Sequence, residues 1–554
     1  MKVKALSTLM VITLLLMACQ TISRVFNNES ATSNQEQTST SAKDNTSDNS
    51  PSSETTNSTS ASEPQAETDS NNQSDNLAQA NLPVSTLFEQ AWDDHAVFKA
   101  GLIADEQDTP DQFPNNSVYH IELTVSDDRS TLMGREEVHY TNSENADLQE
   151  IYFHLYPNLL GGSVNIANLT INGEPAIFEY LYSRESVMKI PLSTALQPGQ
   201  AIIIGMDFEI TVPQTQDRNY GIFANVEEIL AAAHFYPLIA TYDDRGWDIE
   251  VPSPQGDVVF ADSSFYLVSI TAPTEMAIVA SGVMVSQEET GSAQTSTFAA
   301  GPMRDFYFVA TEKYGVISQT VDETTIHSYY LPGREASAES ALQYAVDSLK
   351  SFKPRYGQYP FTELDIVPTA NLALGIEYPG IVAINATLYD PNAKLGDWPV
   401  TVFFESTVVH EVAHQWFYSL VGNDQLAEPW VDESLTQYAT WRYYLDTYGQ
   451  GGANGFEQSL RSRWERLEFA EIPIGQPVSE YDGREYSAIV YGRGPLFFDA
   501  LADEMGQETL DAFLLDYALT FRWGIAYASD LQTKAEAQCA CQLDDLFNSW
   551  VYGQ

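Results

Sequence analysis

The sequence predicts a multidomain protein, in which an N-terminal all-β sheet or sandwich domain is followed by an α+β domain that is mainly helical in its C-terminal part. The chain has 554 residues, of which 44% are hydrophobic and 12% aromatic, so it can bury more than one core. Before about residue 310, apolar and polar residues alternate as in strands, and after it apolar residues recur with a helical period. We therefore expect a β domain over 85–310 and the second domain over 311–554.

The first 84 residues are predicted to precede these domains. Two lysines and an apolar run from Ala5 to Ala18 are typical of a secretory signal, since the run is short for a membrane span. The run ends in "LMAC", which resembles the lipobox of bacterial lipoproteins. This predicts a lipoprotein signal peptide over 1–18, a lipid anchor at Cys19 and an exported, membrane-anchored protein. The alternative is a differently cleaved signal with a chance cysteine.

Residues 19–84 are rich in Ser, Thr and Asn and have few large apolar side chains. Such a segment cannot bury enough apolar surface to offset the entropy lost on ordering, so it is predicted to be a disordered tether. Cys539 and Cys541 follow much later as "CAC". A bridge between cysteines this close in sequence is strained, so two free thiols are favoured over a disulfide.

The predicted β domain contains alternating runs such as "SVYHIELTVSDD", "AIIIGMDFEITV" and "SSFYLVSITAPTEMAIVASG", separated by turn residues. In the second domain, residues 336–352 place Ala338, Leu342, Ala345, Leu349 and Phe352 on one helical face. Further helices are predicted over 401–421, 428–449 and 493–506, the second of which opens at Pro429 with acidic residues in its first turn.

Charge excludes one class of partner. The formal net charge is −51, with 26 Lys and Arg against 77 Asp and Glu. Binding to phosphates requires clustered cations, so nucleic acid is not an expected partner.

The sequence "VVHEVAHQWF" contains the strongest chemical signal, because His410 and His414 stand four positions apart around Glu411. On a helix these histidines share one face and can bind one metal ion, while Glu411 lies about 100° away, where it can act on a water instead. This pattern predicts one catalytic Zn²⁺, for which a third protein ligand is required. Glu433 is the favoured candidate, in the first turn of the next predicted helix; Asp432 and Glu428 are its rivals.

His410, Glu411 and His414, the 18 residues that separate His414 from Glu433, and the flanking "AHQWF" and "PWVDESL" together resemble the aminopeptidase N family of gluzincin zinc peptidases. The resemblance covers about 115–554 and selects Glu433 as the third ligand. It implies a thermolysin-like catalytic domain over 311–554 and peptide substrates. It also implies a short form that lacks the C-terminal helical domain of longer members.

Two further residues take roles from this resemblance. The stretch "LGIEY" resembles, loosely, the G-x-M-E-N exopeptidase signature, and this places Glu377 at the substrate's α-amine. The stretch "IVYGRGPLFF" resembles the segment whose tyrosine stabilises the oxyanion, which places Tyr491 in that role and Arg493 just after it. Glu411 would be the general base.

This chain departs from the family in two places near the site. Ser434 stands where the family usually has glycine. The β-domain segment "ILAAAHFYP" lacks the Gln or Glu pair that many members contribute to the amine site, which weakens the case for strict exopeptidase action. Two alternatives therefore stay open, a thermolysin-like endopeptidase and a non-catalytic peptide-binding surface lipoprotein.

Overall fold

The computed structural model describes residues 86–554. The predicted signal peptide, Cys19 and the tether lie outside the described residues. Residues 86–112 form short 3-10 turns rather than strands. These turns pack partly against the second domain, where the N–H of Ile103 donates to the carbonyl of Pro360 at 2.9 Å.

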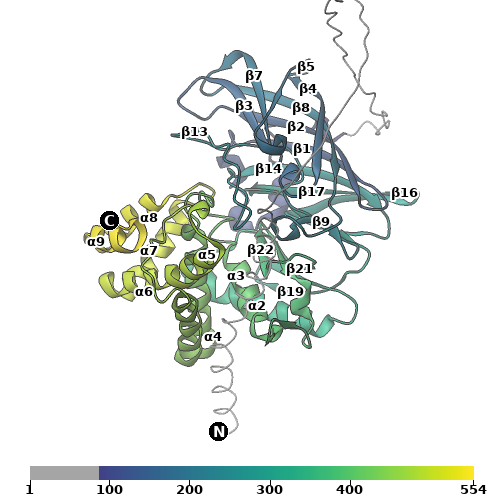
Figure 1. Cartoon of the computed structure of the whole chain (residues 1–554). Coiled ribbons are helices and arrows are strands. Elements are labelled where there is room, and N and C mark those ends of the chain that lie inside the picture. Colours follow the sequence, from purple (N-terminus) through teal and green to yellow (C-terminus); the bar gives the residue numbers. More distant parts are fainter. Residues whose placement is uncertain (1–85) are drawn as a thin grey trace, which may run out of the picture.

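The N-terminal half consists of β-sheets, as predicted, and all three of the alternating runs form strands (Figure 1). Strand alternation is clearest in β2, where every second side chain from Leu132 to Tyr140 is buried. The principal strands are β1 Val118–Val125, β2 Thr131–Thr141, β3 Leu148–His154, β4 Ser163–Ile171, β5 Glu174–Pro175, β6 Glu179–Leu181, β7 Val187–Leu196, β8 Ala201–Thr211, β9 Phe223–Val226, β10 Ile229–Ala232, β11 Leu238–Ile239, β14 Ser264–Pro273, β15 Ala277–Ala280, β16 Val283–Thr290, β17 Ala293–Met303 and β18 Phe308–Thr311.

These strands form one large sheet and two smaller ones. The eight-stranded sheet has the order β16-β17-β14-β1-β2-β8-β4-β5, with β1 and β14 parallel and the other neighbours antiparallel. The four-stranded sheets have the orders β15-β18-β10-β9 and β11-β3-β7-β6. Two hairpins, β12 Tyr242–Asp243 with β13 Gly246–Trp247 and β24 Lys394–Leu395 with β25 Trp398–Pro399, are short additions.

The C-terminal half is an α+β unit, and this confirms the predicted fold class. Its strands β19 Gly315–Val321, β20 Thr324–Tyr330, β21 Glu363–Thr369, β22 Gly375–Tyr378 and β23 Ile381–Asn385 form one sheet in the order β19-β20-β21-β23-β22. Its helices are α2 Glu335–Tyr356, α3 Phe404–Ala413, α4 Trp430–Glu465, α5 Gly483–Ala488, α6 Gly494–Met505, α7 Gln507–Thr520, α8 Ala528–Cys539 and α9 Asp544–Phe547. Helices α6 to α9 lie at the end of the molecule away from the large sheet (Figure 1).

The helix predictions are right in position but differ in length. The apolar face predicted for 336–352 is buried in α2. Helix α3 is shorter than expected and ends at Ala413, and the chain then makes a turn through Tyr418, where φ is 138°. Helix α4 is longer and continues past a kink at Gly449. The short α3 matters, because the turn after it places groups beside the predicted metal ligands.

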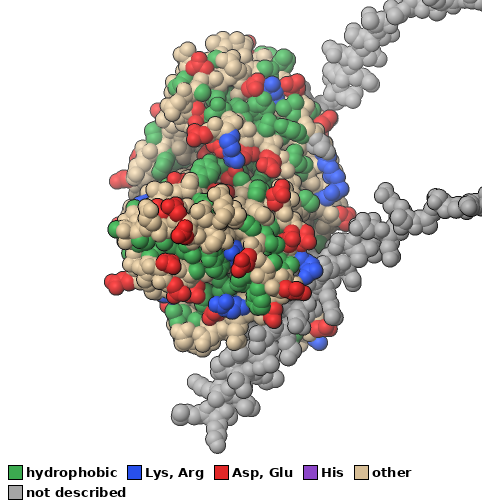
Figure 2. All heavy atoms as spheres, turned by 60° about the vertical axis from the view of Figure 1, so that its left-hand side comes forward, with side chains coloured by type: hydrophobic (Ala, Val, Ile, Leu, Met, Phe, Trp, Pro, Cys, Tyr) green, Lys and Arg blue, Asp and Glu red, His purple; other side chains and the backbone are tan. Residues whose placement is uncertain are grey.

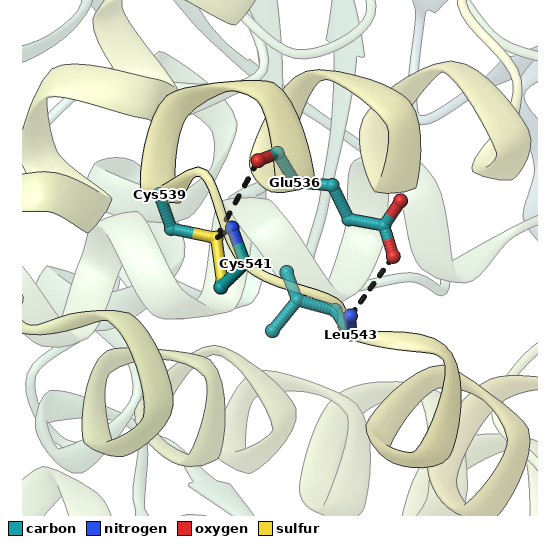
Figure 3. Close-up of a disulfide and its surroundings, with 4 residues drawn as sticks. All are labelled: Glu536, Cys539, Cys541 and Leu543. Atoms are coloured by element: carbon teal, nitrogen blue, oxygen red, sulfur yellow. Dashed lines mark hydrogen bonds between the residues drawn. A yellow bond between two sulfur atoms is a disulfide. The ribbon is translucent and has the colours of Figure 1, made fainter.

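Cys539 and Cys541 are joined by a disulfide, so the prediction of two free thiols is wrong (Figure 3). The bridge closes at the end of α8, where Ala540 adopts a left-handed conformation. After it, the N–H of Leu543 donates to Glu536 at 2.8 Å. The turn leads directly into α9 and the C-terminal residues.

One buried apolar cluster extends through both halves. Among residues 86–554, none of the helices is both long and apolar enough to cross a membrane. The face that carries the C-terminal helices shows many acidic and few basic side chains (Figure 2), in keeping with the composition.

Candidate metal centre and active site

Helices α3 and α4 bring three predicted ligands together. The Nε2 atoms of His410 and His414 lie 3.1 Å apart, and Oε2 of Glu433 lies 3.1 Å from the first and 3.4 Å from the second. Ligand atoms about 2.0–2.1 Å from a tetrahedral zinc ion are separated by about 3.3 Å. The three donor atoms therefore fit Zn²⁺ in both spacing and chemical type.

The turn after α3 prepares His414 for this role. Its Nδ1–H donates to the carbonyl of Phe417 at 2.9 Å, which leaves the Nε2 lone pair free for a metal. Burial lowers the pKa of His410 to about 4, so that its imidazole is neutral, as a ligand must be. The early end of α3 is thus what allows Phe417 to orient the second histidine.

The two rivals of Glu433 have other partners. Asp432 accepts hydrogen bonds from Gln425 at 2.8 Å and from Asn423 at 3.2 Å. Glu428 accepts from the N–H of Ala528 at 2.8 Å. Burial would raise the pKa of Glu433, but its hydrogen bonds to the two histidines hold it below the usual range. Glu433 is therefore the carboxylate that this geometry offers to a metal.

Glu411 and Glu377 form a second cluster with His414. A carboxylate oxygen of each and a ring nitrogen of His414 all lie within 4.8 Å of one another. Glu377 stands on the edge strand β22, next to α3. The close approach depends on Gly375, because a Cβ at that position would lie 2.4 Å from Oε1 of Glu411.

Tyr491 reaches the site from a π-helical turn, Ile489–Arg493. Its hydroxyl donates to Oε1 of Glu433. Ser434, at the position where the family usually has glycine, donates to the carbonyl of Val490 at 2.6 Å. This bond ties the metal-ligand helix to the turn that carries Tyr491. A Cβ on Gly494 would lie 1.9 Å from Oγ of Ser434, so Ser434 fits because residue 494 is glycine.

Arg493 does not enter the site. It is buried, donates to the carbonyls of Ile472, Ser549 and Trp550, and lies over the ring of Trp550 with its Cζ 4.4 Å from the ring centroid. Its role is structural, since these bonds attach the C-terminal residues to the turn beside Tyr491.

A small cavity beside Glu377 is shared by both halves of the chain. Glu377 and Gln425 line it from the second domain, and His234 and Asp257 line it from the β domain. Sequence reasoning missed Asp257, which lies in a loop after β13, where no periodicity marks it. The loop is anchored by Gln255, whose Nε2 donates to the carbonyl of Tyr481 at 2.7 Å. The segment that lacks the family's Gln or Glu pair supplies His234 to the cavity instead.

The site is crowded with acidic groups. Burial raises the pKa of Glu377 and Glu411, and neighbouring carboxylates raise both further. Burial also raises the pKa of Asp257, to which Glu433 and Asp432 add. Carboxylates packed this closely repel one another unless cations lie between them. The arrangement suits two cations, a metal at the histidines and a second positive group near Glu377.

Comparisons with known proteins agree with this geometry. Residues 340–550 match the family described as the peptidase family M1 domain. The chain is 24% identical over 413 residues to aminopeptidase M1-B of Oryza sativa subsp. japonica, which covers 71% of this chain and 46% of that protein. It is 21% identical over 467 residues to the puromycin-sensitive aminopeptidase of Caenorhabditis elegans, a match that covers 79% of this chain and 46% of that protein. The chain thus spans about half the length of these relatives.

The fold is also similar to that of the M1 zinc metallopeptidase from Deinococcus radiodurans, with a TM-score of 0.60 and 18% identity, over 79% of this chain and 94% of that one. Fold and site geometry are together similar to those of gluzincin-type zinc peptidases. Over residues 340–550, which match the peptidase family M1 domain, the predicted family resemblance is confirmed.

Proposed function

We propose that this protein is a zinc-dependent aminopeptidase that removes N-terminal residues from peptides. The observation that carries the proposal is the place of Glu377, whose buried carboxylate lies within 4.8 Å of a carboxylate oxygen of Glu411 and a ring nitrogen of His414. A protonated α-amine bound to Glu377 would place the first peptide bond of a substrate beside the metal ligands. Asp257, in the same cavity, adds a second carboxylate for that amine.

Each residue then has a defined role. His410, His414 and Glu433 would hold one Zn²⁺, which supplies an activated water and polarises the scissile carbonyl. Glu411 accepts the proton of the attacking water and passes it to the leaving amine. Tyr491 donates from its hydroxyl to the oxyanion that develops on the substrate carbonyl. Glu377 and Asp257 bind the α-ammonium and fix which bond is cut.

The names of similar proteins support the aminopeptidase reading over the two alternatives. The curated relatives named above are aminopeptidases. A structure of a mutant of the Deinococcus radiodurans enzyme, with a TM-score of 0.57 and 19% identity, is bound to a Tyr-Ser-Ala substrate. An endopeptidase has no use for paired carboxylates in a cavity of this kind, and a binding protein has none for Glu411.

Mass-spectrometric mapping of products from one peptide, offered free and N-acetylated to the zinc-loaded protein, tests the proposal. Stepwise loss of N-terminal residues from the free peptide alone is the expected result. Equal internal cutting of both peptides would instead establish an endopeptidase, and binding without cutting would establish the non-catalytic alternative.

We also propose that the protein is exported and held at a membrane by a lipid on Cys19. The proposal rests on the apolar run that ends in "LMAC". Metabolic labelling with a fatty-acid analogue should mark the wild type and not Cys19→Ser. Unlabelled wild-type protein in the cytosol would refute the anchor without affecting the proposed activity.

A further inference from the structure

Gln425 lines the cavity beside Glu377, and the mechanism proposed above gives it no role. It lies in the segment between α3 and α4 and is 2% exposed. Its Nε2 donates to Oε1 of Glu377 at 3.2 Å and to Oδ2 of Asp432 at 2.8 Å. Gln425 therefore links the carboxylate at the predicted amine site to the residue that precedes the metal ligand Glu433.

These two bonds determine which way the amide points. Ionised carboxylates only accept hydrogen bonds, so with Glu377 and Asp432 ionised the NH₂ group faces them. The amide oxygen, Oε1, has no hydrogen-bond partner among the described residues. A buried acceptor without a partner costs stability unless a ligand or water satisfies it. Gln425 lines the cavity and thus offers it a hydrogen-bond acceptor that has no other partner among the described residues.

The segment that carries Gln425 is held by an arginine of the β domain. Arg304 is 2% exposed and donates from Nε to the carbonyl of Tyr418 at 2.7 Å and from Nη2 to that of Leu420 at 3.3 Å. The guanidinium packs so closely that a Cβ on Gly422 would lie 2.2 Å from its Cζ. In addition, Asp305 accepts from the hydroxyl of Tyr418 at 2.9 Å. These contacts hold the turn that precedes Gln425 against the β domain.

We propose that Gln425 is a binding residue for the substrate's α-ammonium and a positioning residue for Glu377. An ammonium has three N–H donors, and Glu377, Asp257 and Oε1 of Gln425 provide three acceptors around one cavity. Nε2 of Gln425 holds the Glu377 carboxylate in place. In this chain, a glutamine next to the metal-ligand helix and an aspartate from a loop stand in for the missing Gln or Glu pair of the β-domain segment. The proposal rests on the aminopeptidase function.

Calorimetric binding of Tyr-Ser-Ala and N-acetyl-Tyr-Ser-Ala tests it, with zinc-loaded protein in a Glu411→Gln background that prevents turnover. Gln425→Met keeps the volume and removes both amide functions. The free peptide should then bind at least ~10-fold more weakly, since a hydrogen bond to a charged group is lost. Binding of the acetylated peptide should change less than ~3-fold, because its amide nitrogen carries no charge.

A matched control is Gln294→Met, which removes another buried glutamine, with bonds to the carbonyls of Pro273 and Met276 in the β domain. It should leave both affinities unchanged. If Gln425→Met does not fold, Gln425→Asn keeps a polar group but withdraws the amide by one methylene, and it should weaken the free peptide selectively.

The outcomes separate this inference from the proposed function. If the Gln425 variants still prefer the free peptide as strongly as the wild type does, the role of Gln425 is refuted and the proposed function is not. Equal weakening of both peptides would reduce Gln425 to a structural role. If the unsubstituted background binds both peptides equally, the aminopeptidase proposal fails first and the role of Gln425 fails with it.

Discussion

The hydroxyl of Tyr491 donates a hydrogen bond to Oε1 of Glu433, while Oε2 of the same carboxylate faces His410 and His414. The residue expected to stabilise the oxyanion is therefore attached to the metal-ligand set itself. The hydroxyl has one O–H, so when substrate binds it can donate to this carboxylate or to the oxyanion, but not to both. Replacing Tyr491 tests both roles at once.

Tyr491→Phe should lower kcat by about 10²–10³-fold, the usual cost of one oxyanion donor, and leave KM nearly unchanged. Zinc content, measured by atomic absorption, should remain close to one per chain, because the three ligands are intact. A variant that loses zinc in proportion to activity would show that the tyrosine serves the metal site only.

Glu411→Gln should retain zinc and lose turnover by at least about 10³-fold, because the amide cannot accept the proton of the attacking water. The measurement is kcat with a free peptide alongside metal content. Near-normal turnover in a zinc-loaded variant would contradict the assignment of Glu411 as general base.

Gly375→Ala should impair activity with little loss of stability. The new methyl would lie 2.4 Å from Oε1 of Glu411, so the carboxylate must move from its position beside His414. We expect kcat to fall by at least about tenfold, since small displacements of catalytic groups are costly. Gly173→Ala is a suitable comparison, since no atom lies within 4 Å of a Cβ there, although its positive φ adds some strain. Unchanged kinetics in Gly375→Ala would mean that Glu411 tolerates displacement.

His154 should make the β domain less stable in acid. Burial lowers its pKa from 6.5 to about 4, although the backbone carbonyl of Asp248 accepts from its Nε2 at 3.0 Å. Between pH 6.5 and 4 the unfolded chain binds a proton that the folded chain does not, so the free energy of unfolding falls as the pH falls, by up to about 1.4 kcal/mol per pH unit.

His154→Gln keeps a donor for Asp248 and removes this titration. Urea denaturation at pH 7 and pH 5 should show that the wild type loses about 2 kcal/mol more than the variant. Carboxyl groups titrate in both proteins and cancel in the comparison. Equal losses of stability in the wild type and the variant would show that His154 takes up its proton equally well in the folded and the unfolded state.

Glu136 should destabilise the fold at neutral pH. It is fully buried on β2, both carboxylate oxygens lack a partner among the described residues, and burial raises its pKa well above 4.5. Because the folded state retains its proton at higher pH than the unfolded state, stability declines as the pH rises above about 4.5. Glu136→Gln removes this decline, and the variant should gain stability relative to the wild type between pH 5 and pH 8 in the same denaturation experiment. A difference in the free energy of unfolding between variant and wild type that stays constant from pH 5 to pH 8 would contradict this prediction.

Several features followed from the sequence alone. The spacing of His410 and His414 on a helix guarantees a shared face, because helical geometry is local. The change from strand to helix periodicity near residue 311 likewise reports local backbone preference. The spacing could not show whether Glu433 or Asp432 is the third metal ligand, since adjacent residues in the first turn of a helix differ only in the direction of their side chains. Resemblance to a family selected Glu433, and the structure shows that Gln425 and Asn423 engage Asp432 instead.

Tertiary structure alone decided the rest of the site. Asp257 and Gln425 come from irregular segments 168 positions apart in the chain, and no period or motif connects them. They meet because Gln255 anchors one loop to the second domain and Arg304 holds the other segment. Such contacts depend on how two domains pack, a long-range property that local propensity does not encode. The sequence by itself therefore predicted the metal ligands and their chemistry, and the packing of the β domain on the second domain decided which further side chains line the cavity beside Glu377.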